Sequence, residues 1–297
     1  MAGSKATSIS GAGSGARMLL FLEEIKVQHS VFALPFAVAA SFLAFGGWPD
    51  RVEFVWIIVA MVSARTLGMA ANRLIDAEID ARNPRTASRG LPSGRLRSRH
   101  VLAWMAASVV LLGISVSQLD ELAWYLSPLV LIVLIGYPYA KRFTWLSHFA
   151  LGTVYLIVPP AVWIALTGGL DAGAVLMGVG GMFWVAGFDV IYATADIDID
   201  REQGIHSIPA RFGIAGALYS ARVFHAVTIA ALIAAGMLLE VSFVYYVGVA
   251  AAGVLLAYEH SLISPRDLSR LGAAFLTMNG IIAIVFGTFA AVGTVVD

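Results

Sequence analysis

Residues 172–200 read AGAVLMGVGGMFWVAGFDVIYATADIDID, and this stretch decides the fold class. Its first part, 172–193, carries a single charge, at Asp189, and matches the roughly 20 residues that a helix needs to cross a bilayer. Polar and apolar residues do not alternate in it, so it predicts a helix rather than a barrel strand. The acidic residues that follow mark the end of this helix as a candidate functional site.

Eight other apolar runs follow one another along the chain, separated by short polar breaks. Together with 172–193 they predict nine transmembrane helices, the other eight spanning residues 30–47, 54–75, 101–119, 122–139, 147–167, 214–238, 241–258 and 272–295. We therefore expect an all-α, polytopic membrane protein, a bundle of about nine helices with a polar cap. Residues 1–17, rich in Gly, Ser and Ala, are expected to be a flexible tail, and 18–297 a single domain.

The composition agrees with a membrane protein. Of 297 residues, 59% are hydrophobic and only 13% are charged, and the mean hydropathy is +0.84. The 19 Lys and Arg balance 19 Asp and Glu, so the chain lacks the basic excess of a nucleic-acid binder and no nucleic-acid partner is expected. Because the chain has no cysteine, it has no disulfide framework, no thiolate metal site and no cysteine nucleophile.

The cations gather in every second loop between the expected spans. The loop between 54–75 and 101–119 is the richest, with Arg82, Arg85, Arg89, Arg95, Arg97 and Arg99. The opposite set of loops holds only Arg51. Since cytoplasmic loops carry the excess of Lys and Arg, this distribution places the N-terminus and the cation-rich loops in the cytoplasm.

Two polar stretches repeat the same four-residue spacing where an even-numbered span reaches the cytoplasm. The first contains Asn72, Asp76 and Asp80, and the second contains Tyr192, Asp196 and Asp200. On a helix this spacing places the side chains of each stretch on one face, where like charges repel unless cations neutralise them. Acidic runs at helix ends are often simply solvated faces. Two runs of the same spacing on the same membrane side instead favour two Mg²⁺ ions held around one diphosphate.

These stretches resemble the two motifs of the UbiA superfamily of intramembrane prenyltransferases, Asn-x-x-x-Asp-x-x-x-Asp and Tyr-Ala-x-x-Asp-x-x-x-Asp. Three further segments are similar to the family in register: Arg85-Thr-Ala-Ser-Arg89-Gly-Leu-Pro-Ser-Gly94, Tyr137-Pro-Tyr-Ala-Lys141-Arg142 and Gly204-Ile-His-Ser207-Ile-Pro209-Ala-Arg211-Phe-Gly213. Within the superfamily the chain most resembles the 4-hydroxybenzoate polyprenyltransferases and their menaquinone-pathway relatives, the MqnP type. Arg73 departs from the family pattern, because many members place Asp after the Asn.

The resemblance implies an aromatic polyprenyltransferase of quinone biosynthesis, with its active site in the cytoplasmic cap of a bacterial inner-membrane protein. The expected partners are polyprenyl diphosphate, an aromatic acid (4-hydroxybenzoate or a related naphthoate) and membrane lipid. Two Mg²⁺ ions are expected, one held by Asn72, Asp76 and Asp80 and the other by Asp196 and Asp200. The expected diphosphate ligands are Arg85, Arg89, Lys141, Arg142 and Arg211.

Four more residues are candidates on the acceptor side. Asp189 lies two helical turns before Asp196 on the same face, and the resemblance implies that Asp189 and Tyr192 act near the acceptor ring. Lys26 and His29, at the entry of the first span, are hypothesised to contact the acceptor carboxylate, although a lone His there is more often structural. Two other functions stay open: prenyl transfer to a porphyrin, sugar phosphate or glycerol ether, and ion-coupled transport through the same carboxylates.

Overall fold

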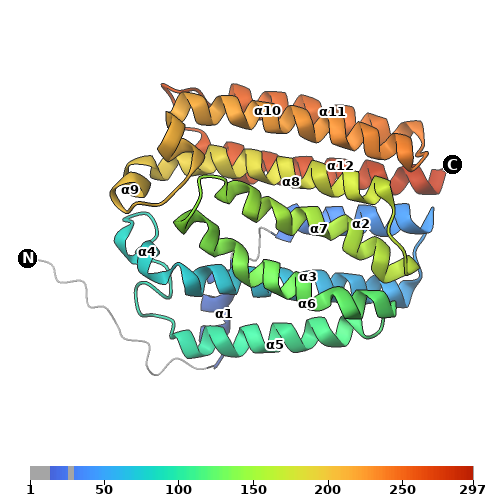
Figure 1. The fold of residues 1–297 in the computed structure, drawn as a ribbon, viewed down its shortest axis with the longest axis horizontal. Coiled ribbons are helices and arrows are strands. Elements are labelled where there is room, and N and C mark those ends of the chain that lie inside the picture. The colour runs from blue at the N-terminus through green and yellow to red at the C-terminus, as the bar shows by residue number, and fades with distance from the viewer. Residues whose placement is uncertain (1–13, 26–29, 297) are drawn as a thin grey trace, which may run out of the picture.

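The computed structural model describes residues 14–25 and 30–296, and within these ranges every regular element is a helix (Figure 1). The elements follow in the order α1 (Ser14–Glu24), α2 (Ser30–Phe45), α3 (Arg51–Ile75), α4 (Ala77–Arg82), α5 (Ser98–Val116), α6 (Glu121–Gly136), η2 (Tyr137–Arg142), α7 (Ser147–Thr167), α8 (Ala172–Ala193), η3 (Thr194–Asp196), α9 (Ile197–Glu202), α10 (Ile208–Leu238), α11 (Phe243–Ser261), η4 (Ala273–Met278) and α12 (Asn279–Val296).

The predicted all-α membrane fold is confirmed. Eight of the described helices are long and apolar enough to cross a membrane, and the shorter apolar helix α2 occupies the place of the first predicted span. Helices α7 and α8 match the predicted ranges 147–167 and 172–193 residue for residue. The other predicted boundaries differ from the structure by a few residues.

Two boundaries differ for identifiable reasons. Helix α10 begins at Ile208 rather than at the predicted residue 214, but Gly213 interrupts it with a non-helical backbone (φ 72°, ψ 177°). Only glycine reaches such angles without strain, so the regular part of the helix starts where the apolar pattern does. Helix α1 begins at Ser14, so residues 14–17 of the expected tail are helical, while residues 1–13 lie outside the described range.

Helix α8 lies between α7 and α10 and packs most extensively against both. Glycines permit the contact with α7, because a Cβ on Gly178 would lie 2.2 Å from the carbonyl oxygen of Leu156. A Cβ on Gly152 would lie 2.7 Å from the carbonyl oxygen of Met182. Small residues at such positions let membrane helices approach closely, and this approach fixes the position of the polar end of α8.

The buried core lies among α2, α7, α8, α10, α11 and α12, around fully buried rings such as Trp184, Phe286 and Tyr245. Helices α5 and α6 instead expose large aliphatic side chains, including Val110, Leu129 and Ile132. In a soluble protein a surface so apolar would be a liability, but against lipid it is the expected exterior.

The short helices α4 and α9 lie at the same end of the bundle, and α12 runs to the opposite end (Figure 1). Helix α1 anchors this polar end. The Glu24 carboxylate accepts a hydrogen bond of 2.6 Å from the backbone N–H of Gly90 in the connection between α4 and α5. The Glu24 carbonyl oxygen accepts a second bond, of 3.0 Å, from Arg73 Nε. The segment that carries two of the five predicted diphosphate ligands, Arg85 and Arg89, is therefore held against the bundle.

Candidate active site

The first acidic motif lies where α3 passes into α4. Asp76 ends α3 and precedes α4, with a backbone (φ −92°, ψ 3°) that leaves the regular helix. Its side chain is only 3% exposed, and its Oδ2 accepts hydrogen bonds from Lys141 Nζ at 2.7 Å and from Asn72 Nδ2 at 2.9 Å. Arg142 Nη1 lies 3.3 Å from Oδ1. Two cations of η2 thus neutralise one nearly buried carboxylate.

Asp80 lies one helical turn further on, in α4, and its side chain is 10% exposed. Arg89 Nη1 donates to its Oδ2 at 2.6 Å, and Arg73 Nη1 lies 3.9 Å from the same oxygen. Arg73, which stands where many family members have Asp, therefore also reaches the first motif. Glu78, which lies between the two aspartates in the sequence, is exposed.

The second motif lies where α8 passes through η3 into α9. The Asp196 carboxylate accepts hydrogen bonds from both Nε and Nη2 of Arg85, with Nε 2.9 Å from Oδ1. It also accepts a hydrogen bond of 2.9 Å from Asn83 Nδ2. Arg85 Nη1 donates to Tyr192 Oη at 2.6 Å. Burial alone would lower the pKa of Arg85, but its hydrogen bonds to Asp196, together with the charges of Tyr192, Asp196 and Asp80, outweigh this and raise the pKa above its ordinary value. Arg85 is therefore a permanent cation.

Asp200 differs from the other three aspartates. Its Oδ2 accepts a hydrogen bond of 3.0 Å from Ser207 Oγ, and among the described residues no Lys or Arg nitrogen lies within 4.0 Å of it. Arg211 does not approach it. The Arg211 guanidinium instead stacks over Trp145, 5.1 Å from the ring centroid, beside a surface depression. Of the five predicted diphosphate ligands, the structure brings four together and leaves Arg211 apart.

These contacts join the two halves of the chain. Asn83 and Arg85 belong to the connection that follows the first motif, yet both bind Asp196 of the second. We use the term collar for the cations Arg85, Arg89, Lys141 and Arg142 with the carboxylates Asp76, Asp80 and Asp196. Charge-assisted pairs of this kind are stronger than neutral hydrogen bonds, so the collar holds its cations in defined positions.

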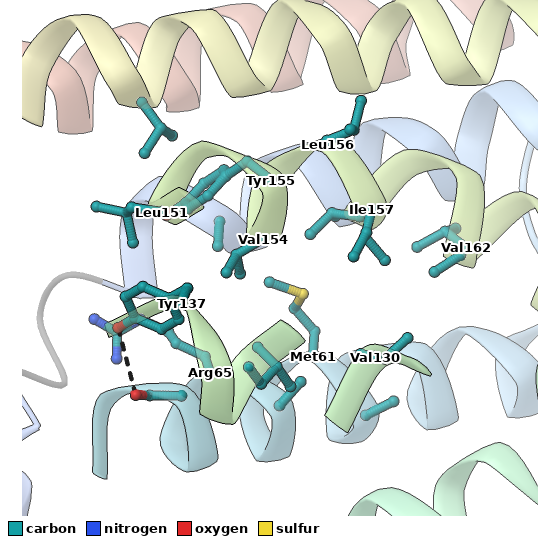
Figure 2. A pocket seen from close by; sticks show the side chains of 18 of the residues that line it. Met61, Arg65, Val130, Tyr137, Leu151, Val154, Tyr155, Leu156, Ile157 and Val162 are labelled. Atoms are coloured by element: carbon teal, nitrogen blue, oxygen red, sulfur yellow. Dashed lines mark hydrogen bonds between the residues drawn. The ribbon is translucent and has the colours of Figure 1, made fainter. Parts of the chain in front are cut away.

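Next to the collar lies a cavity of about 610 Å³, lined mainly by apolar side chains of α3, α5, α6, α7 and α8. Figure 2 shows some of the side chains that line it. Asn72 and Arg89 line its polar end, and Leu119 and Ala123 line it where α5 turns into α6. The cavity therefore runs through most of the length of the bundle. Its walls suit an apolar chain whose charged head sits in the collar.

Arg65 is a charged group within this apolar cavity. It projects from α3 beside Tyr137, whose hydroxyl donates to the carbonyl oxygen of Gly68 at 3.4 Å (Figure 2). Arg65 Nη1 donates to the carbonyl oxygen of Ile25 at 3.3 Å. An ionisable side chain inside a membrane span is a functional candidate by default, because burying its charge is costly.

The two predicted acceptor-side residues of α8 both line the cavity. Tyr192 stacks on Phe275 with ring centroids 4.0 Å apart, and the Arg85 guanidinium lies 4.9 Å from the Tyr192 centroid. Asp189 Oδ2 lies 2.6 Å from Nδ1 of His148. The predicted residues Lys26 and His29 lie outside the described residues.

Sequence reasoning missed several residues of this site. Arg65 could have been found, because it is a charge inside a predicted span. Asn83, Glu24 and His148 carry no such local signal, because each reaches a partner that is distant in the sequence.

The donor set suits a hard divalent cation. Carboxylate and amide oxygens are the ligands that Mg²⁺ prefers, and it usually takes one or two carboxylates and completes its shell with water and phosphate. Within 14–25 and 30–296 no three His, Cys, Asp or Glu side chains gather closely enough to hold a metal by themselves. That arrangement fits an ion shared with a phosphate ligand rather than one caged by protein.

The fold and the site define a polytopic α-helical membrane protein with an ionic collar over an apolar cavity. The chain belongs to the UbiA prenyltransferase family, whose model matches residues 33–293. It is 32% identical over 252 residues to the 4-hydroxybenzoate octaprenyltransferase of Aliivibrio fischeri (strain MJ11), covering 83% of this chain and 86% of the relative.

Solved structures agree with this assignment. The apo structure of a UbiA homologue from Aeropyrum pernix K1 matches with a TM-score of 0.81 and 33% identity, over 89% of this chain and 97% of that one. A UbiA homologue from Archaeoglobus fulgidus bound to DMAPP and Mg²⁺ has the same fold, with a TM-score of 0.71 and 17% identity over 92% and 98% of the two chains. The protein is thus an integral membrane prenyltransferase.

Proposed function

We propose that the protein transfers a polyprenyl group from polyprenyl diphosphate to an aromatic acid, 4-hydroxybenzoate or a related naphthoate, in ubiquinone or menaquinone biosynthesis. The observation that carries the proposal is the placement of the collar at the polar end of the apolar cavity. A prenyl diphosphate has the same division into a strongly anionic head and a long apolar tail.

The collar residues would bind and activate the diphosphate. Arg85, Arg89, Lys141 and Arg142 supply the donors that phosphate oxygens require, and pairing with carboxylates holds them in place before the substrate arrives. Fixed cations of this kind stabilise the charge that develops on the leaving diphosphate. The placement of Arg211 against Trp145 does not support a part for it in this site.

Mg²⁺ is the proposed cofactor, with two ions expected. Asn72, Asp76 and Asp80 would hold one ion, and Asp196 and Asp200 the other. When bound, Mg²⁺ acts as a Lewis acid that neutralises the leaving diphosphate. The Archaeoglobus fulgidus homologue bound to DMAPP and Mg²⁺ supports this use of a divalent cation.

The acceptor would lie in the cavity between Arg65 and Asp189. The guanidinium of Arg65 suits the carboxylate of an aromatic acid. Lys26 and His29 stay candidates for the same role, and Lys26 follows directly in the sequence after Ile25, whose carbonyl oxygen Arg65 contacts. A ring carbon of the acceptor forms a bond to C1 of the prenyl chain as the C1–O bond to diphosphate breaks. The ring then loses its proton, and Asp189 is the proposed base.

The rings of Tyr192 and Phe275 stack beside the collar, and Tyr192 lines the cavity, where its face would shield the positive charge of the allylic carbon. The names of curated relatives favour 4-hydroxybenzoate over other acceptors. We place the protein in the bacterial inner membrane with its N-terminus and collar in the cytoplasm, because the cations of the sequence gather on that side.

A direct assay tests the proposal. Purified protein in nanodiscs would be given one labelled prenyl diphosphate, about 1 mM Mg²⁺ (within the usual range of KM values) and a panel containing 4-hydroxybenzoate, a naphthoate, a porphyrin, a sugar phosphate and a glycerol ether. We expect prenylated aromatic acid, formed only with Mg²⁺ and lost with EDTA. Product from a non-aromatic acceptor alone would contradict the acceptor assignment. Ion-coupled solute uptake by vesicles without prenyl transfer would point to a carrier.

A further inference from the structure

His148 is a buried histidine that has no role in the proposed reaction as described above. It lies in the first turn of α7, is 3% exposed, and points its Nδ1 at Oδ2 of Asp189, 2.6 Å away. The Asp189 side chain is 28% exposed and lines the cavity. The pair therefore consists of one residue that faces the substrate space and one that is packed behind it.

The contact of the second ring nitrogen indicates which nitrogen of His148 donates to Asp189. The backbone N–H of Ile208, in the first turn of α10, points at Nε2 from 3.3 Å. A backbone N–H can only donate, so Nε2 must be the acceptor and carry no proton. Nδ1 is then the ring nitrogen that donates to Asp189.

This geometry has a chemical consequence for Asp189. A hydrogen bond donated to one oxygen of a carboxylate fixes the rotation of that carboxylate. Among the described residues Asp189 Oδ1 accepts no hydrogen bond, so it is the oxygen left for an acceptor molecule.

We propose that His148 is a positioning residue that holds the Asp189 carboxylate correctly rotated toward the acceptor. The inference rests on the proposed function, in which Asp189 serves the acceptor. His148 would act through Asp189 and not touch the substrate itself.

His148 also connects the acceptor side of the cavity to the second acidic motif. Ile208 follows Ser207, whose hydroxyl donates to Asp200 at 3.0 Å. The same loop is tied to α7 by a neighbouring bond, in which Ser147 Oγ donates to the carbonyl oxygen of His206 at 3.1 Å. One imidazole thus aligns Asp189 with the segment that follows the proposed metal ligands.

Three variants separate these roles. His148→Phe keeps a flat ring of similar size but removes both nitrogens. His148→Asn keeps a donor, because its Nδ2 takes the place of imidazole Nδ1, but loses the acceptor for Ile208. Ser147→Ala is the matched control, since it removes the adjacent bond to the same loop and leaves Asp189 untouched.

The measurement is kcat and KM for prenyl transfer to the aromatic acid, with thermal unfolding in the same nanodiscs. We expect His148→Phe to lower kcat by about 10- to 100-fold, the usual cost of losing a group that orients an active-site ligand. The KM for prenyl diphosphate should stay close to that of the unmodified protein. His148→Asn should recover at least half of the loss on a logarithmic scale, and Ser147→Ala should retain nearly full kcat.

A purely structural role would give a different result. If His148→Phe matched the unmodified enzyme, or if Asn and Phe were equally impaired, the proposal would be overturned. If His148→Phe did not purify as folded protein, His148→Ala would replace it, and its kcat should likewise be lower than that of His148→Asn. Failure of the unmodified protein to prenylate any aromatic acid would instead refute the proposed function, so the two failures are distinguishable.

Discussion

The two acidic motifs share their spacing but differ in their surroundings. In the first, Asp76 and Asp80 are almost buried and are contacted by Lys141, Arg142 and Arg89. In the second, Asp196 is bound by Arg85, whereas Asp200 has only the hydroxyl of Ser207. Helix α9, which carries Asp200, has no buried residue among those that the structure describes.

This difference shows that spacing alone does not set the electrostatics of a site. All four collar cations come from the first half of the chain, in the connection after α4 and in η2. The first motif is close to its own cations, while the second depends on Arg85 and Asn83 reaching across. We infer that the first motif is rigidly organised, and in the proposed metal assignment Asp200 would rely most on the bound ion for neutralisation.

The largest effect is expected at the centre of the first motif. Asp76→Asn removes the charge that organises Lys141 and Arg142, while keeping the shape of the side chain. Prenyl transfer should fall by about 100- to 1,000-fold, the usual cost of removing one preorganised electrostatic group. Steady-state kinetics measure this, with Arg97→Ala, an exposed arginine outside the collar, as the control. Retention of more than a tenth of the activity would contradict a central role for Asp76.

The contact between the two motifs is tested next by Arg85→Lys. Lysine keeps the charge but cannot bind Asp196 as a fork and also donate to Tyr192. We expect kcat/KM for prenyl diphosphate to fall by about 100-fold, a smaller effect than that expected for Asp76→Asn. Raising the Mg²⁺ concentration should not restore the activity. Activity close to that of the unmodified enzyme would show that a point charge suffices at this position.

Asp200 and Asp80 give the sharpest contrast between the motifs. Asp200→Asn should mainly raise the Mg²⁺ concentration needed for half-maximal activity, by about 10-fold, a typical cost of weakening a metal site. Asp80→Asn should lower the maximal rate as well, because Arg89 loses its partner. Mg²⁺ titrations of both variants check this. Identical responses would remove the distinction that we draw between the motifs.

The smallest effect is expected for Ser207→Ala. This variant removes the single side-chain hydrogen bond that the structure gives Asp200. A hydrogen bond to a charged group contributes about 1.5 kcal/mol, so the Mg²⁺ requirement should shift by about 10-fold or less, in the same direction as for Asp200→Asn. A double-mutant cycle with Asp200→Asn should show non-additive effects, and full additivity would mean that Ser207 acts elsewhere.

Much of this molecule could be predicted from its sequence. The apolar runs predicted the eight described helices that are long and apolar enough to cross a membrane, and also the shorter apolar helix α2, because a bilayer admits few alternatives to an uninterrupted helix. The repeated four-residue spacing gave both motifs, and four of the five predicted diphosphate ligands meet at them. Long helices and local spacing are properties that neighbouring residues determine.

The rest depends on contacts between distant segments. The sequence does not show that Asn83 and Arg85 reach Asp196, or that His148 binds Asp189 across α7 and α8. It also does not show that Arg211 stacks on Trp145. An arginine that follows an acidic motif in the sequence looks the same whether its side chain turns into the site or away from it. Packing decides such contacts, and in this chain the close approach of α7 to α8 is one determinant.

The central claim is that the collar binds a diphosphate through metal and carboxylates together. It is tested most directly by equilibrium binding of geranyl diphosphate to the purified protein, with Mg²⁺ and with EDTA, for the unmodified chain and for the Asp76→Asn/Asp196→Asn double variant. We predict that Mg²⁺ strengthens binding to the unmodified protein by at least about 10-fold, equivalent to 1.4 kcal/mol, and leaves binding to the double variant unchanged. Equal binding with and without Mg²⁺ in the unmodified protein would contradict the account.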